Sequence, residues 1–405
     1  MTFKYISVFL LIFLYLTQLR SAFSTSPIFY FFSVLGLGVL LLDIINNKVN
    51  KDVFTIILIN LLMVLIQIIS FAFNGQGDFY FIREIVLYNF ISILFCLFFY
   101  KINVNNKIQY DYIKIIAFAV LLQLLLSFYA FLNSSFFDLL FTAFPLNLGF
   151  GKLDEFAEIR MVTLGTPFFG SAILSSVVIL ILAQKINNNK ETDFKLFLSF
   201  IVICALSILS ARTAIIAVVF SLFVIFSNKK NSYKYFFMSI LIFIAIYILS
   251  KSISLSNRFT DFVDFGFEFI YNYKNSQASE SVDGVTEMLS VVPGDIKTWL
   301  IGDGYYKASN GVQYYKNIDV GFLRSIFSFG ILGLSVFIFL NIFIVYKINK
   351  DYMSAKTKLL IFICFMLLMV KGLANIFPHL MLVYTLSLIN KNMSNNNDIN
   401  RNTIL

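Results

Sequence analysis

The sequence predicts an all-α polytopic integral membrane protein with about 12 transmembrane helices and a long, partly helical outer loop between helices 9 and 10. Composition is the first reason: 59% of the 405 residues are hydrophobic and 13% are charged, against roughly 25% charged in soluble domains. The mean hydropathy of +0.84 points the same way. The third reason is that the apolar residues form blocks of about 16 to 24, the length that crosses a bilayer.

Taken in order, these apolar blocks predict helices joined by short polar connectors. They cover residues 4–19, 27–45, 53–73, 84–100, 113–132, 164–184, 194–210, 212–228, 235–250, 320–346, 358–376 and 378–390. Asn375 to Pro378 is compatible with a tight turn or with a kink in one long helix. Residues 1–24 also resemble a signal peptide. The later connectors lie on their predicted sides of the membrane, however, only if this block is retained as a transmembrane helix.

This reading makes residues 1–390 a single transmembrane bundle. Its outer loops are residues 74–83, 133–163 and 251–319, and its polar tail, residues 391–405, is expected to be disordered and cytoplasmic. With a cytoplasmic N-terminus, the inner connectors hold 18 basic and seven acidic residues, a net charge of +11, which leaves −2 for the outer side. Because lysine and arginine collect on the cytoplasmic side, both termini are placed inside.

Arginine is distributed differently from lysine. Six of the seven arginines fall on the outer side, and they are Arg20, Arg83, Arg160, Arg212, Arg258 and Arg324. A guanidinium binds phosphate or carboxylate through two parallel hydrogen bonds, so the set suggests an anionic ligand outside the membrane. The alternative is that each arginine anchors its helix at the interface or pairs with an outer carboxylate.

Two short motifs place such arginines at helix starts. Arg212 follows Leu209-Ser-Ala and opens a helix whose N-terminal amides point outward, which favours an anion such as a lipid-linked phosphate. Arg160 precedes the block at 164–184, with Pro167 expected in its first turn. A simple interfacial anchor remains the alternative role for both arginines.

The loop at 251–319 holds further candidates. Asp261, Asp264 and Glu268 lie on one face of a predicted amphipathic helix, which favours support on the bilayer surface over sugar binding. The stretch from Trp299 through Asp303 to Gly304 predicts a glycine turn with unusual backbone angles.

The end of the loop supplies the candidate base. Asp319 opens the block at 320–346, and Arg324 follows five residues later. Asp319 fits a base at the membrane surface, with Arg324 nearby to hold the negative charge of a substrate, and an ordinary helix cap is the alternative. Gly330 and Gly333 are expected to permit close helix contact. His379 is a second candidate base, although a lone histidine at a helix end is more often structural.

Several classes of function are excluded or disfavoured. The three cysteines lie inside apolar blocks and there is one histidine, so neither a disulfide framework nor a metal site is expected. The basic charge is explained by topology, so no nucleic-acid partner is expected. No nucleotide-binding loop is found, and no cofactor is expected.

These motifs and their order resemble the O-antigen polymerase (Wzy) family of bacterial surface polysaccharide assembly. The resemblance rests on the helix layout with a long late outer loop and on four stretches: Arg160 to Gly170, Ser210 to Thr213, Leu300 to Gly304, and Asp319 to Leu323 followed by Gly330 to Gly333. The related O-antigen ligases place a histidine where this chain has Asp319. That difference favours the polymerase.

The resemblance implies a metal-independent glycosyltransferase in the bacterial inner membrane, with its active site facing outward. It would join oligosaccharide repeat units linked to undecaprenyl pyrophosphate and release undecaprenyl pyrophosphate. Asp319 would act on the attacking hydroxyl, while Arg160, Arg212, Arg258 and Arg324 would bind pyrophosphate or sugar; His379, Asp303 and Trp299 are weaker candidates. Membrane lipids, a chain-length regulator and a flippase are the implied partners.

Two other functions remain open at this point. An O-antigen ligase shares the layout. A lipid-linked oligosaccharide flippase or other transporter is disfavoured because its charges should line a path inside the helices, whereas here most outer charges lie in loops and at helix ends.

Overall fold

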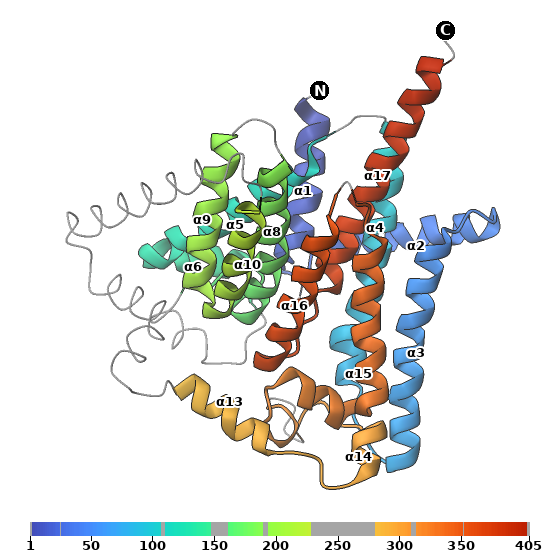
Figure 1. Cartoon of the computed structure of the whole chain (residues 1–405), viewed down its shortest axis with the longest axis vertical. Coiled ribbons are helices and arrows are strands. Elements are labelled where there is room, and N and C mark those ends of the chain that lie inside the picture. The colour runs from blue at the N-terminus through green and yellow to red at the C-terminus, as the bar shows by residue number, and fades with distance from the viewer. Residues whose placement is uncertain are drawn as a thin grey trace. The chain divides into compact units, whose positions relative to one another are not determined.

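The computed structural model describes residues 2–24, 26–106, 110–146, 161–188, 193–227, 280–308, 313–350 and 352–402 (Figure 1). Within these ranges every regular element is a helix and no strand is present, which confirms the all-helical class. Several predicted features lie outside the described residues: Arg160, Arg258, the helix at 235–250 and the amphipathic helix around Asp261 to Glu268.

Five of the described helical segments are long and apolar enough to cross a membrane. They are Lys51–Asn74, Ile82–Val104, Tyr112–Leu132, Phe169–Asn188 and Gly321–Lys347. Shorter apolar helices accompany them, including Phe29–Ile45 and Phe194–Ser210. In a bilayer a backbone satisfies its own hydrogen bonds most simply as a helix, so long apolar runs and an all-helical fold belong together. The chain therefore has the character of a helical membrane protein.

Most of the predicted helices in the described ranges are found close to their expected positions, whereas the helices at 134–143, 280–290 and 296–301 lie in stretches predicted as outer loops. The described helical elements follow in chain order. They are α1 (Thr2–Thr17), α2 (Phe29–Ile45), α3 (Lys51–Asn74), η1 (Ile82–Val86), α4 (Leu87–Asn106), α5 (Tyr112–Leu132), α6 (Ser134–Ala143), α8 (Phe169–Asn188), α9 (Phe194–Ser210), η2 (Arg212–Ala214), α10 (Ile215–Ile225), α13 (Glu280–Ser290), α14 (Ile296–Ile301), η3 (Tyr315–Asn317), α15 (Gly321–Lys347), α16 (Ala355–Lys371) and α17 (Phe377–Asn402). The last two are separate helices, which decides between the turn and the kink left open by the sequence.

Four helix ends differ from the prediction by five residues or more. α4 continues to Asn106 where the prediction ended at residue 100, and α16 ends at Lys371 where the prediction ended at residue 376. The other two ends belong to α17 and α8. α17 continues to Asn402, through residues expected to be disordered from position 391. Its extension is anchored by Asn390, which donates to the Tyr352 hydroxyl at 2.8 Å, and by Asn392, which donates to the Tyr100 hydroxyl. α8 begins at Phe169, five residues later than predicted.

The chain divides into two compact units. The first contains Met1–Pro27, Asp111–Glu280 and Ser354–Cys364; the second contains Ile28–Tyr110, Ser281–Met353 and Phe365–Leu405. Each unit is built from segments that are distant in the sequence.

In the first unit α8 packs against α5, α9 and α10, and most of its side chains are buried (Figure 1). The backbone before α8 is buried but not helical. Gln123 of α5 donates to the carbonyl of Leu164 at 2.6 Å, and the N–H of Leu164 donates to the Ser127 hydroxyl at 2.9 Å. These bonds replace helical ones, which explains the late start of α8.

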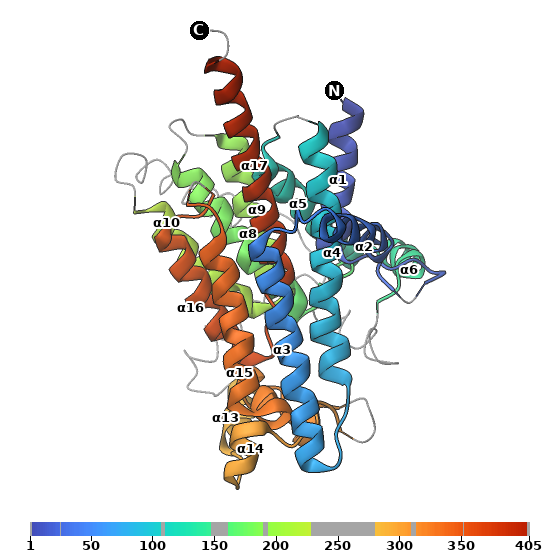
Figure 2. The ribbon, with the colours of Figure 1, turned by 90° about the vertical axis from the view of Figure 1, so that its right-hand side faces the viewer.

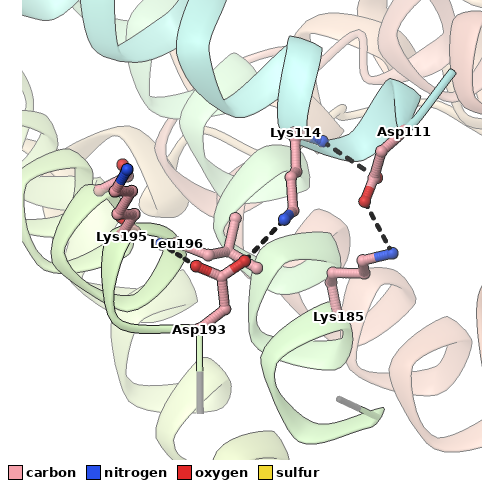
Figure 3. A network of polar contacts seen from close by, with 7 residues as sticks. Asp111, Lys114, Lys185, Asp193, Lys195 and Leu196 are labelled. Atoms are coloured by element: carbon pink, nitrogen blue, oxygen red, sulfur yellow. Dashed lines mark hydrogen bonds and ion pairs between the residues drawn. The ribbon is translucent and has the colours of Figure 1, made fainter. Parts of the chain in front are cut away.

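One end of the first unit carries two ion pairs (Figure 3). Lys114 lies 2.6 Å from Asp193, and Lys185 lies 3.1 Å from Asp111. The Lys114 hydrogen bond holds the pKa of Asp193 below its usual value, and the N–H of Leu196 adds to the effect. All four charged residues were assigned to one membrane side by the sequence.

In the second unit α3 and α15 lie side by side, as both views show (Figures 1 and 2), while α4 packs against α2 and α17. Ion pairs mark both ends of these helices. Lys101 pairs with Asp43 and Lys347 with Asp52, near the end of α4 and the start of α3. The opposite end has the pairs Lys307–Glu84, Lys316–Asp303 and Arg324–Asp319. Every one of these pairs joins residues predicted on the same membrane side.

Candidate functional site

The candidate site lies in the second unit, where α15 is interrupted. Phe329 (φ −143°, ψ 15°) and Gly330 (φ 69°, ψ −176°) leave the helical conformation inside the apolar run. The turn after α14 packs into this break: the N–H of Asp303 donates to the carbonyl of Phe327 at 2.6 Å. A Cβ atom on Gly330 would lie 2.1 Å from the Leu300 oxygen, so glycine is required there.

The glycine turn at Gly302 and Gly304 is confirmed, since both residues have positive φ angles of 76° and 83°. Two polar side chains on the buried face of α3 hold it. Asn74 donates to the Gly302 carbonyl at 2.9 Å, and Gln67 donates to the Gly304 carbonyl at 3.4 Å. A buried carbonyl without a partner costs free energy, and these amides remove that cost.

The same α3 face also binds the interrupted part of α15. Ser70 donates to the Ser328 carbonyl at 3.4 Å, and the Ser328 hydroxyl donates to the Gln67 side-chain oxygen at 3.3 Å. The turn and the first part of α15 are therefore fixed to one another and to α3. Two of the four stretches that carry the family resemblance consequently lie in one structural block: the stretch at 300–304, and the stretch at 319–323 with its continuation at 330–333.

The connector between α3 and α4 fixes the next part of the loop. Asp78 accepts hydrogen bonds from the N–H groups of Tyr306 at 2.7 Å and Lys307 at 2.9 Å. Glu84 forms an ion pair with Lys307 at 2.7 Å, and the Lys307 ammonium lies 4.8 Å from the centre of the Tyr80 ring. The result is a defined position for Tyr306.

Arg324 is the centre of the site and is almost completely buried, with 7% of its surface exposed. One terminal nitrogen lies 3.2 Å from an oxygen of Asp319, and the other donates to the hydroxyl of Tyr306. Its guanidinium carbon lies 3.4 Å from the centre of the Tyr314 ring and 4.5 Å from that of Tyr306. A planar cation between aromatic rings is held rigidly.

Asp319 combines a fixed backbone with an accessible carboxylate. Its neighbours Ile318 and Val320 are buried in a cluster with Leu323 and Phe327, while 46% of the Asp319 side chain is exposed. The N-cap of α15 is Val320, without a side-chain cap bond, so Asp319 does not have the capping role considered as the alternative. The arrangement can present the Asp319 carboxylate, oriented by Arg324, to a hydroxyl outside the helices.

A second carboxylate, Asp303, is directed inward. It accepts a hydrogen bond from Thr298 and lies 3.4 Å from the Lys316 ammonium. Burial, assisted by Asp303, raises the pKa of Tyr315 to about 12. Tyr315 stacks on Tyr305 with the ring centres 5.3 Å apart, and both rings are partly exposed.

Trp299 forms a hydrogen bond within the second unit, whereas His379 is buried without such a bond at its Nδ1 atom. The Trp299 indole donates to the Pro293 carbonyl at 3.1 Å. His379 lies in the first turn of α17 and is 5% exposed; its Nδ1 atom has no hydrogen-bond partner among the described residues. Nearby in sequence, Asn375 donates to Asn89, which donates to Asn60, so this buried region has a polar character.

Arg212 belongs to the first unit. It starts the single turn η2 that leads into α10, as predicted, and is partly buried. Ala211 and Ala214 on either side pack against Ala172 of α8, so small side chains let this turn approach α8.

Sequence reasoning missed Tyr306, Tyr314 and the polar face of α3. The α3 signal was present, because Asn60, Gln67 and Ser70 recur at helical spacing inside an apolar run, where polar residues are costly and usually functional. The tyrosines gave no comparable signal among the 21 tyrosines of the chain.

Comparison with known proteins adds no assignment: no family model matches the chain, and no curated protein or solved structure shows significant similarity to it. Within the described ranges, no group of three or more His, Cys, Asp or Glu residues is placed to hold a metal ion.

Proposed function

We propose that this protein is a polysaccharide polymerase of the O-antigen or capsule type. It joins oligosaccharide repeat units linked to undecaprenyl pyrophosphate on the outer face of the bacterial inner membrane. The proposal includes about 12 crossings, both termini in the cytoplasm and the loop at 251–319 outside. The helical membrane character and the family resemblance support it.

The observation that carries the proposal is the pairing of an accessible Asp319 carboxylate with a buried Arg324. In the proposed reaction a sugar hydroxyl of the acceptor attacks the anomeric carbon of the donor. The new C–O bond forms as the bond to the pyrophosphate oxygen breaks, undecaprenyl pyrophosphate leaves, and Asp319 takes the hydroxyl proton.

Arg324 is given a different role from the direct substrate contact expected from the sequence. Because its guanidinium is buried against Asp319, Tyr306 and Tyr314, it acts as a positioning residue for the carboxylate. Charge stabilisation of the leaving pyrophosphate is assigned to Arg212, Arg160 and Arg258, which are the remaining arginines of the predicted set.

Sugar contact is assigned to the partly exposed pair of Tyr305 and Tyr315. Aromatic faces stack on the apolar faces of sugar rings, and this pair lies in the same unit as Asp319. Asp303 pairs with Lys316 and forms a side-chain hydrogen bond with Tyr315.

The test is the length profile of surface polysaccharide on gels, from a deletion strain of the source bacterium carrying wild type or a variant. Asp319→Asn is expected to lower chain extension by about 10²–10⁴-fold, the usual contribution of a general base. Asp295→Asn is the matched control, because Asp295 is an exposed carboxylate of the same loop that caps α14, and asparagine caps equally well. Protein amounts are compared by blot.

Three outcomes separate the candidate functions. If the protein is a polymerase, the deletion strain should carry single repeat units. Asp295→Asn should then restore the ladder of longer chains, and Asp319→Asn should not. Long polymer that stays unattached to its acceptor would identify a ligase instead, and complete loss of surface repeats would favour a flippase. Full activity of Asp319→Asn would show that Asp319 is not the base of the reaction.

A further inference from the structure

A cavity of about 270 Å³ lies in the second unit, at the opposite end of the helices from Arg324. Its apolar wall comes from four helices, through Leu40 of α2, Val53 of α3, Leu97 of α4 and Leu388 of α17. The volume is close to the roughly 300 Å³ at which small-molecule sites begin. A wall of this kind accommodates a hydrocarbon group of a ligand.

The rim of the cavity is polar, and most of its groups are already engaged. Asp43 is paired with Lys101 at 3.4 Å, and Asn50 accepts a hydrogen bond from the backbone of Asp52. Tyr384 donates to the Asp52 carboxylate at 3.3 Å.

Lys48 differs from the other rim residues. Its ammonium group has no ion pair or hydrogen bond with the residues that the structure describes, and its side chain is exposed at the rim. Since Asp43 is neutralised by Lys101, the charge available to a ligand here is positive. The ligand that complements this cavity therefore carries an anion next to a hydrocarbon tail.

The position of the cavity along the helices that are long enough to cross a membrane narrows the choice of ligand. It lies where α3 begins and where α4 approaches its end, and both are long enough to cross a bilayer. Tyr100 and Tyr384 line it, as expected at the depth of lipid headgroups, where tyrosine is enriched. Leu41 and Leu42 of α2 are 51% and 60% exposed, so apolar surface continues beside the cavity.

We propose that this cavity binds a phospholipid, with the phosphate of its headgroup at Lys48 and the first part of one acyl chain against Leu40, Leu97 and Leu388. The cavity encloses only part of the lipid, and the remaining chain lies along the exposed apolar surface of α2. This site is independent of the proposed polymerase activity.

The test uses the full-length protein, purified in detergent, and native mass spectrometry with added phosphatidylglycerol. Wild type is expected to retain one tightly bound phosphatidylglycerol. Lys48→Gln should weaken this binding about fivefold, the contribution of one lysine near an anionic headgroup. Leu97→Trp should abolish it by filling the cavity.

Lys51→Gln is the matched control, because Lys51 is exposed three residues from Lys48 and does not line the cavity. It should retain the lipid like wild type. Lys48→Gln changes an exposed side chain, so its fold is preserved even if Leu97→Trp is unstable.

A second measurement distinguishes a lipid from a simple phosphate ion. Inorganic phosphate should not displace phosphatidylglycerol, because it lacks the chain that contacts the leucines. Equal weakening by Lys48→Gln and Lys51→Gln, or displacement by phosphate at concentrations equal to those of the lipid, would overturn the proposal.

Discussion

At the scale of single residues, the site depends on how a buried arginine is satisfied. The Arg324 guanidinium has three kinds of partner: the Asp319 carboxylate, the Tyr306 hydroxyl and the faces of Tyr306 and Tyr314. Burial raises the pKa of Tyr306, so its hydroxyl stays neutral. A buried charge that loses a hydrogen-bond partner keeps its desolvation cost, so the loss of each partner should lower the stability of the protein by a measurable amount.

Tyr306→Phe should therefore lower stability by about 1.5–3 kcal/mol, the usual range for a hydrogen bond to a charged group. The phenylalanine ring keeps the aromatic contact and removes only the hydroxyl. The adjacent Tyr305→Phe is the control, since Tyr305 is partly exposed and contacts Tyr315 through its ring. Both variants would be compared with wild type by chemical unfolding in detergent, and equal stability of the two would show that the Arg324–Tyr306 bond contributes little.

At the scale of elements, the main feature is the interrupted helix α15. The first part of α15 carries Arg324 and ends at Phe329, where the turn from Leu300 to Gly304 replaces the lost helical contacts. The interruption places the start of α15 against α14 and α3 in one block, so it determines where Asp319 points.

Gly330→Ala should be strongly destabilising. Its backbone angles are essentially restricted to glycine and cost about 1–3 kcal/mol for other residues, and the new Cβ would collide with the Leu300 oxygen. Gly38→Ala is the control, because Gly38 lies inside α2 with no atom within 4 Å of its added Cβ. Thermal unfolding in detergent at one scan rate should show a lower midpoint for Gly330→Ala alone; matching midpoints would mean that the break in α15 does not require glycine.

The elements also show what the sequence could and could not predict. Long apolar blocks predicted most helices, because crossing length and hydrophobicity act locally. The glycine turn before Tyr305 was also predicted, because the backbone preference of glycine is likewise a local property. The break at Phe329 was not, because it lies inside a continuous apolar run and depends on Leu300 and Gln67, which are distant in sequence.

The candidate site was predicted only in part. Asp319 and Arg324 were both predicted as site residues, but the ion pair between them, at 3.2 Å, was not predicted. The burial of Arg324 between Tyr306 and Tyr314 depends on the loop held by Asp78, and no local pattern reports such a contact. Arg160 and Arg258 lie outside the described residues, so their roles stay predictions.

At the scale of the whole molecule, the ion pairs bear on membrane topology. In the second unit, pairs such as Lys101–Asp43 and Lys307–Glu84 lie at opposite ends of the segment formed by η1 and α4. Each pair joins residues assigned to the same side from lysine and arginine counts. A misassigned connector would have separated such partners by the thickness of a bilayer, roughly 30 Å. The contacts thus agree with the two-sided assignment, while the number of crossings and the direction of the chain across the membrane stay predictions.

That direction is tested by labelling single cysteines in intact cells with a membrane-impermeant maleimide. Ser290→Cys, at the exposed end of α13, should react from outside, whereas Asn46→Cys, in the connector before α3, should react only after the membrane is opened. Wild type serves as background, because Cys96, Cys204 and Cys364 are all buried. The physical basis is the excess of lysine on one side, which holds that side in the cytoplasm. The reverse labelling pattern would invert the topology and place Asp319 on the cytoplasmic side, away from lipid-linked repeat units exposed outside, and the proposed polymerase reaction would then have no access to its base.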